Sequence, residues 1–272
     1  MLFRSSILEY FGVIDRLTKP PGEGGSYMDA FHLVIPTLPG FGFSGPTREA
    51  GWDTRRIAHA WIELMRGLGY ERYGAAGGDW GSYVSLEMGR QAPEELIGAH
   101  VSQIFLAPPG GFSESGDLTQ DDREAIKGLE WFDENMSSYD AVQSQQPETL
   151  AFALADSPAG WLAWVAQIFR DGVDDEFVLE NAALYWLTGT IASAARIYYE
   201  HRHAKGSSEP TRVPVGLAMF KDDYKSFRSL AMKAHPKLIR WKAYEVGGHW
   251  PAFQVPEIWA ADLREFFRAA RI

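Results

Sequence analysis

The chain has 272 residues and a formal net charge of −10, and 46% of its residues are hydrophobic. This length suits one large α/β domain or a core domain with an insertion, and the acidic balance argues against nucleic acid or an anionic membrane as a partner. The absence of cysteine excludes disulfides, thiolate metal sites and a cysteine nucleophile. Because no apolar run reaches membrane-spanning length and the N-terminus lacks the apolar segment of a signal peptide, we expect a soluble, cytoplasmic protein.

The first seventy residues predict two helices with a strand and two loops between them. Apolar residues at helical spacing indicate a helix over 7–17, a Pro/Gly loop follows over 19–25, and 32–36 has the pattern of a buried strand. The glycine-rich run 38–45 formally matches a dinucleotide fingerprint, but Pro46 and Gly51 stand where that motif requires a helix, so we interpret the run as a tight rim. A helix is expected over 54–68 with Thr54 as its cap.

A short strand, a glycine-rich turn and a helix come next. Residues 70–73 are β-prone, 74–82 read Gly-Ala-Ala-Gly-Gly-Asp-Trp-Gly-Ser, and 83–88 begin a helical pattern that ends near Pro93. Gly77 and Gly81 stand two residues before and after Asp79, which is the spacing of a nucleophile elbow. Asp79 would also serve as a helix cap, but as a nucleophile its carboxylate needs no activating base and forms an ester with the carbon it attacks.

The remaining chain predicts a helical insertion between two parts of one α/β core. A strand over 96–104 precedes roughly a hundred residues of helical pattern, which is far too long for a simple crossover. Strand patterns return over 213–220 and 238–246, followed by Asp223 and His249, and 258–269 predicts a closing helix. The expected parts are therefore 1–107 and 211–272 for the core and 108–210 for a helical cap. The order Asp79, Asp223, His249, each after a strand, is that of an α/β-hydrolase site.

Several motifs together carry a family resemblance. They are Gly-Gly-Asp-Trp-Gly-Ser at 77–82, Ser-Tyr-Asp-Ala-Val-Gln at 138–143, Asp-Ser-Pro-Ala-Gly at 156–160, Tyr-Trp-Leu-Thr-Gly-Thr-Ile at 185–191 and Gly-Gly-His at 247–249. From about residue 6 to the C-terminus, the sequence resembles the microsomal-type epoxide hydrolases, a group that includes the juvenile-hormone epoxide hydrolases. The resemblance implies an α/β-hydrolase fold, with a mostly parallel sheet and an inserted helical cap. It also implies the conversion of a lipophilic epoxide to a vicinal diol.

The resemblance also implies a role for each site residue. Asp79 would attack an epoxide carbon, and His249, oriented by Asp223, would activate water to cleave the resulting ester. The Trp80 N–H would stabilise the oxyanion that forms during this cleavage. No cofactor or metal is implied, the partners are an epoxide and water, and a homodimer is one alternative for the oligomeric state.

Two cap tyrosines would supply the proton for the epoxide oxygen. The resemblance selects Tyr139 and Tyr198, and phenols suit the role because they stay protonated at neutral pH and donate strong hydrogen bonds. Packing within the cap is the alternative role for both. Tyr199 is a rival to its neighbour, although successive helical residues point roughly 100° apart. His201 and His203 lie in a charged segment with no third ligand suggested nearby, which argues against a metal site.

The sequence departs from the family at its start. The family carries first strands and a His-Gly-x-Pro turn before the helix that begins here near Ser6, and this sequence contains no such motif. We therefore expect an N-terminally truncated chain that lacks one oxyanion donor, and that is poorly soluble or nearly inactive alone. Two alternatives to an epoxide hydrolase stay open, a haloalkane dehalogenase, which also uses Asp followed by Trp, and a non-catalytic fragment.

Overall fold

The computed structural model describes residues 6–19, 29–106, 119–169, 172–207 and 209–271. The chain enters through a short 3-10 helix, η1 (Ile7–Tyr10), which continues into α1 (Phe11–Thr18). Ser6 caps this entry, since its hydroxyl accepts a hydrogen bond from the Leu8 N–H at 3.1 Å. Leu17 of the apolar stripe is buried, together with Val13, whereas Phe11, another residue at the predicted helical spacing, is 56% exposed. The loop expected over 19–25 lies, apart from its first residue, outside the described residues.

A four-stranded parallel sheet forms the centre of the described chain. Its strands lie in the order β1 (Tyr73–Gly77), β2 (Leu96–Val101), β3 (Val215–Met219) and β4 (Leu238–Ala243). All four strands run in the same direction, so their carboxyl ends meet at one edge, where open α/β sheets place their sites. Strand β3 is buried throughout, as expected for a strand covered on both faces.

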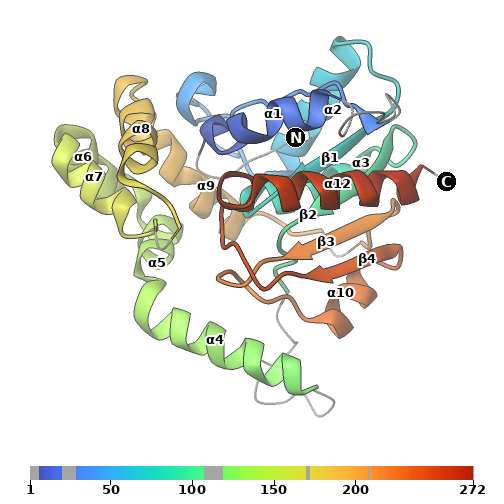
Figure 1. The fold of residues 1–272 in the computed structure, drawn as a ribbon. Helices are drawn as coiled ribbons and strands as arrows, with labels where there is room; N and C mark the ends of the chain where they lie inside the picture. Colours follow the sequence, from blue (N-terminus) through green and yellow to red (C-terminus); the bar gives the residue numbers. More distant parts are fainter. Residues whose placement is uncertain (1–5, 20–28, 107–118, 170–171, 208, 272) are drawn as a thin grey trace.

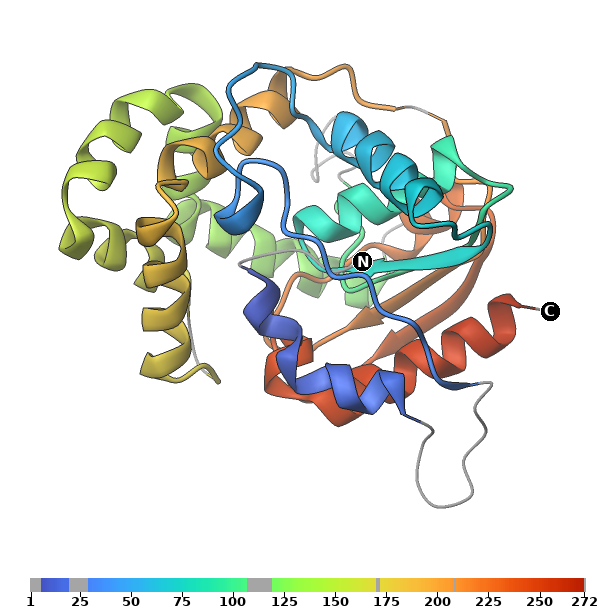
Figure 2. The same ribbon diagram turned by 90° about the horizontal axis from the view of Figure 1, so that it is seen from above.

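Helices cover both faces of the sheet (Figures 1 and 2). On one face lie α2 (Thr54–Gly67), α3 (Trp80–Gln91) and α10 (Arg228–Ala234). On the other lies α12 (Pro256–Ala270), preceded by the short α11 (Pro251–Gln254) and packed against α1. Gly216 of β3 permits this close packing, because a Cβ there would stand 2.5 Å from the ring of Phe266.

A buried charge network ties α12 to the sheet. Asp262 of α12 accepts hydrogen bonds from Arg240 Nε of β4 at 2.9 Å and from the Tyr244 hydroxyl at 2.5 Å, and it lies 2.7 Å from Nε2 of the buried His100 on β2. Burial alone would raise the pKa of Asp262, but its contacts with His100 and Arg240 outweigh burial and hold that pKa well below its usual value. The carboxylate therefore stays ionised inside the protein.

The prediction of a strand over 32–36 is wrong. The segment is extended beside β1 (Figure 2), but it forms no ladder with any described strand. Its apolar side chains do face two sides, since Val34 packs into the cluster that contains Ala75 while Leu33 and Ile35 pack into the cluster that contains Ala76. Side-chain burial on two faces gave the strand pattern, and backbone pairing, which that pattern does not report, is missing.

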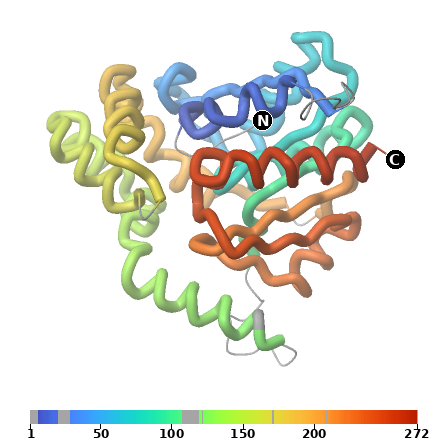
Figure 3. The backbone as a smooth tube through the Cα atoms, in the orientation of Figure 1, coloured from blue at the N-terminus to red at the C-terminus, as the bar shows by residue number. Residues whose placement is uncertain are grey.

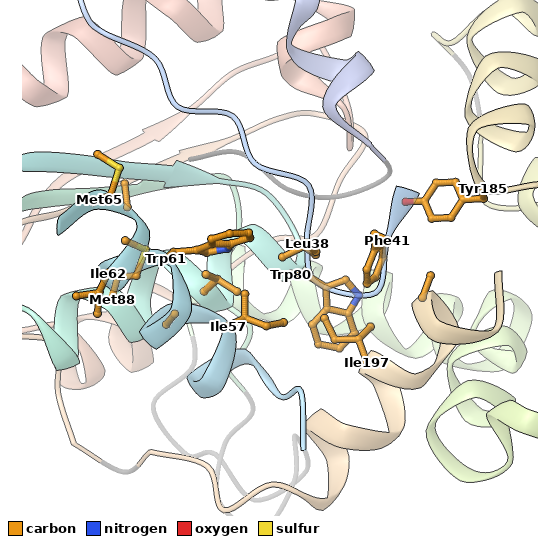
Figure 4. Close-up of a cluster of buried hydrophobic side chains, with 14 of the residues drawn as sticks. Leu38, Phe41, Ile57, Trp61, Ile62, Met65, Trp80, Met88, Tyr185 and Ile197 are labelled. Carbon is orange, nitrogen blue, oxygen red and sulfur yellow. The ribbon is translucent and has the colours of Figure 1, made fainter. Parts of the chain in front are cut away.

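The helices between β2 and β3 form a group beside the sheet, visible in the backbone trace of Figure 3. They are α4 (Gln120–Met136), α5 (Ser138–Gln145), α6 (Pro147–Asp156), α7 (Pro158–Ala166), α8 (Asp175–Leu187) and α9 (Ile191–His203). One hydrophobic cluster joins this group to the core, because Tyr185 of α8 and Ile197 of α9 belong to the same cluster as Trp80 and Ile57 (Figure 4). None of the described helices has the length and hydropathy to cross a bilayer.

Several element boundaries differ from the sequence-based prediction. The cap of α2 is Asp53, whose carboxylate accepts the Arg56 N–H at 2.8 Å, and Thr54 is the first helical residue. The strand expected over 70–73 is shifted, since β1 begins at Tyr73, and those expected over 96–104, 213–220 and 238–246 are shorter. The glycine-rich run opens no helix of the dinucleotide-binding kind. Instead, Gly40 O accepts a hydrogen bond from the Ser193 hydroxyl of α9.

Candidate active site

Asp79 stands on a sharp turn between β1 and α3. Its φ of 49° and ψ of −120° make it the only residue other than glycine with positive φ among those described. Such a conformation costs about 1–3 kcal/mol and persists only where the surroundings enforce it. The turn brings Gly77 so close to the helix that a Cβ on it would lie 2.7 Å from the carbonyl carbon of Gly81. The glycine spacing in the sequence therefore reflects a physical contact between the strand end and the first turn of α3.

His249 and Asp223 lie opposite this turn on two neighbouring loops. An isolated parallel bridge between Asp222 and Gly248 aligns the loops, and the Asp222 N–H donates to Gly247 O at 3.0 Å. His249 Nδ1 forms a short hydrogen bond with Asp223 Oδ1. With Nδ1 engaged by the carboxylate, the basic lone pair is on Nε2. That nitrogen lies 3.6 Å from Asp79 Oδ2.

Gln254 holds the histidine loop in place. Its side-chain oxygen accepts the Gly248 N–H at 2.9 Å and the Trp250 N–H at 3.1 Å, one on each side of His249. Gly247, with φ of 72°, supplies the left-handed residue that this turn needs. The sequence motifs indicate the histidine but not the glutamine that fixes its backbone.

Gln103, which lies just past the end of β2, is a second glutamine at the site that the sequence motifs do not indicate. Its side chain contacts the backbone of Asp79 and the carboxylate of Asp223, so it bridges the nucleophile turn and the acid. Gln103 is fully buried two residues beyond the end of β2, but its burial is known only from the structure. It carried no motif, and its two partners are distant in the sequence, so only the fold brings them together.

The two predicted cap tyrosines come together above the nucleophile turn. Tyr139 of α5 and Tyr198 of α9 have ring centroids 6.1 Å apart, and the Tyr198 ring stands edge-on to Trp80 with centroids 4.8 Å apart. Tyr199 points elsewhere, since it is 39% exposed and stacks on His203. The structure thus brings Asp79, Asp223, His249, Tyr139 and Tyr198 to one region, with Trp80 between the core and the cap residues.

Aromatic side chains extend from this region. Tyr83 stacks on Phe105 with ring centroids 5.1 Å apart. The ring centroid of Tyr83 also lies 4.5 Å from that of His201. Burial lowers the pKa of His201 and raises the pKa of Tyr83, so both side chains favour their neutral forms. His201 Nδ1 lies 3.3 Å from the Thr54 hydroxyl, and His203 Nδ1 lies 2.8 Å from Tyr199 O, so the two rings serve different partners.

A separate hollow of about 570 Å³ lies between α2, α3 and the side chains or backbone of Gly206, Ser207, Glu209 and Arg212. None of the residues that line it belongs to the group around Asp79. Several of its charged side chains pair within the lining, as Arg90 does with Glu87 at 2.8 Å and Arg212 with Glu209 at 3.9 Å. We therefore place the chemistry at Asp79 and not in this hollow.

The chain is similar to known proteins in both sequence and fold. A protein of Stigmatella aurantiaca (strain DW4/3-1), whose name marks it as a candidate epoxide hydrolase, is 37% identical over 98% of this chain and 62% of its own length. Epoxide hydrolase 1 of Sus scrofa is 31% identical over 95% of the chain and 64% of its own. The structure of the Aspergillus niger epoxide hydrolase matches with a TM-score of 0.84 at 27% identity, over 97% of this chain and 69% of that one.

The chain is a homologue of the epoxide hydrolases and has the α/β-hydrolase fold. No protein-family model matches it. The juvenile hormone epoxide hydrolase of Bombyx mori has the same fold, with a TM-score of 0.80 at 26% identity over 99% of this chain and 68% of that one. The chain spans a little under two thirds of the length of the curated epoxide hydrolases it matches. All of the relatives and structures named here carry the name of an epoxide hydrolase, and none of them is named a haloalkane dehalogenase.

Proposed function

We propose that this chain carries the catalytic site of an epoxide hydrolase, which converts a lipophilic epoxide to a vicinal diol through an ester on Asp79. One observation carries the proposal. The Asp79 carboxylate lies on a strained turn, 3.6 Å from the Nε2 of a histidine held by Asp223, and two cap tyrosines converge beside Trp80. The names of the sequence relatives support the same reaction class.

In the first step, Asp79 attacks one epoxide carbon. The carbon–oxygen bond on that carbon breaks, which relieves the strain of the three-membered ring, and the departing oxygen takes a proton from Tyr139 or Tyr198. General-acid assistance of this kind contributes about 10²–10⁴-fold in rate. The product of the step is an alkyl ester of Asp79 that carries a neighbouring hydroxyl.

In the second step, His249 removes a proton from water, and the resulting hydroxide adds to the ester carbonyl of Asp79. The oxyanion forms near the Trp80 N–H at the start of α3, where the helix dipole favours negative charge. Collapse of this intermediate breaks the ester bond, and the departing alkoxide takes the proton held by His249, which releases the diol. The proton left on the Asp79 carboxyl group returns through water to the tyrosine that gave up its own, so the carboxylate, the imidazole and the phenol are all restored. Asp223 stabilises the imidazolium in between.

The surroundings of the site favour an apolar substrate. Trp80, Tyr83 and Phe105 present aromatic surface next to Asp79, and the cap adds Tyr139 and Tyr198. Ligand sites for apolar molecules are lined in this way, with a few polar groups placed at the reacting centre. The cap tyrosines also distinguish this site from one for alkyl halides, since a departing halide needs no proton.

The proposal is tested by diol formation from a panel of lipophilic epoxides. Asp79→Ala should abolish the reaction, and Asp223→Ala should impair it. Asp222→Ala is the matched control, because it removes the neighbouring exposed carboxylate that contacts the histidine loop through its backbone alone. Chloride release from haloalkanes is measured in parallel. Chloride release without diol formation would reverse the assignment, and unchanged diol formation in Asp79→Ala would remove the proposed nucleophile.

A further inference from the structure

Gln103 bridges the nucleophile turn and the acid of the site. Its side-chain oxygen accepts the Asp79 N–H at 2.7 Å and lies 3.1 Å from the Ser82 hydroxyl, and its side-chain nitrogen donates to Asp223 Oδ2 through a short hydrogen bond. The residue is fully buried. A single side chain therefore connects two of the three groups that act in the second step of the proposed reaction.

The chemistry of its partners fixes which end of the amide points where. A backbone N–H can only donate, so the oxygen of the amide must face Asp79. A carboxylate oxygen can only accept, so the NH₂ group must face Asp223. The position therefore requires one side chain that accepts at one end and donates at the other, which an amide does at every pH. A carboxyl group does so only when it is protonated.

We propose that Gln103 is a positioning residue that couples the backbone of the nucleophile to the orientation of Asp223. The inference rests on the proposed function. By engaging Oδ2, Gln103 leaves Oδ1 of Asp223 for His249 Nδ1, which keeps the basic lone pair of the imidazole on Nε2 toward Asp79. By accepting the Asp79 N–H, it also helps to enforce the strained conformation of that residue. The hydrolysis of the ester, which depends on His249, should be the step most sensitive to Gln103.

The charged groups around the amide define what a new charge would do there. Asp79 and Asp223 face it directly, and His249 contacts Asp223. Lys225 lies near Asp223, but its ammonium donates to the carbonyls of Phe220 at 2.5 Å and Lys221 at 2.7 Å, and burial lowers its pKa. Lys225 is therefore engaged elsewhere, so a second carboxylate in this position would face the carboxylate of Asp223, and like charges in a buried site favour protonation.

The decisive variant is Gln103→Glu, which preserves shape and can replace the amide only in its protonated form. At pH 8 we expect ester hydrolysis to slow by about 10–100-fold, the size of a lost charge-assisted hydrogen bond, so that the ester on Asp79 accumulates. The ratio of the variant rate to the wild-type rate should rise as pH falls from 8 to 6. Taking this ratio at each pH removes the pH dependence that the two proteins have in common. Gln91→Glu, an exposed position on α3, is the control for an added charge and should keep a ratio near one at every pH.

A purely structural role for Gln103 would lower both rate constants together, or only the melting temperature, and the ratio would not change with pH. Either result would overturn the inference, and so would a Gln103→Glu variant that hydrolyses the ester at the wild-type rate. In each of these cases, diol formation by the wild type would leave the proposed function standing. A second readout does not need turnover. In the proton NMR spectrum, the His249 Nδ1–H signal, assigned by its loss in His249→Gln, should show an additional titration step in Gln103→Glu. If the wild type forms no diol, the proposed function fails, and this signal alone decides whether Gln103 acts on the Asp223–His249 pair.

Discussion

The close approach of Gly77 to α3 makes a sharp prediction about Gly77→Ala. The added methyl group would lie 2.7–2.8 Å from the Cα, carbonyl carbon and oxygen of Gly81, whereas ordinary contacts begin at 3.4 Å. These atoms are backbone and cannot rotate aside, so the strand end and the helix must separate. Overpacking in a dense region costs about 1–3 kcal/mol, and the rigid obstacle places this variant in the upper half of that range. The melting temperature should then fall by about 4–12 °C.

Gly78→Ala is the matched control. Its added methyl group would lie 3.5 Å from the nearest atom, Gln103 Oε1, which is an ordinary contact. Neither glycine has a positive φ, so backbone strain does not distinguish the two variants. Gly78→Ala should change the free energy of unfolding by no more than about 1 kcal/mol. Thermal unfolding followed by circular dichroism compares the two variants with the wild type. Equal melting temperatures for Gly77→Ala and the wild type would refute the close contact.

Two further predictions concern the cap and the core. In single-turnover measurements, Tyr139→Phe and Tyr198→Phe should each slow the alkylation step by about 10²–10⁴-fold. Tyr199→Phe should stay near the wild-type rate. If Tyr199→Phe were slow and Tyr198→Phe normal, the roles of Tyr198 and Tyr199 would be exchanged. Burial lowers the pKa of His235 to about 4, below its unfolded value of about 6.5. The folded state therefore binds fewer protons between these values, and stability should fall as pH drops from about 6.5 to about 4. Urea unfolding across this range should show a flatter pH dependence in His235→Gln, and an unchanged profile would count against a buried neutral imidazole.

The sequence predicted the parts of this fold that depend on local pattern. The glycine spacing around Asp79 located the turn, and the apolar periodicity located α1, α2 and α12. The extended segment over 32–36 shows the limit of such patterns. The packing of Leu33, Val34 and Ile35 on two sides is a property of side chains, whereas pairing in a ladder depends on a neighbouring backbone that the local sequence does not describe.

The candidate site divides in the same way. Asp79, Asp223 and His249 could be predicted because each follows a strand pattern, and parallel strands bring their carboxyl ends to one edge. Gln103 and Gln254 could not, because each acts through a side-chain amide on a backbone group or carboxylate that only the folded chain places nearby. Amides have no characteristic spacing and no reactivity of their own, so nothing in the sequence marks them as part of a site.

The central claim is that Asp79 becomes an ester and that His249 is needed to release it. The most direct measurement is mass spectrometry of the His249→Gln variant after incubation with an epoxide that the wild type converts. The account predicts that the peptide containing Asp79 gains the mass of one epoxide, and that the same treatment leaves this peptide unmodified in an Asp79→Ala, His249→Gln double variant. An unmodified Asp79 peptide in His249→Gln, or an adduct on another residue, would contradict it.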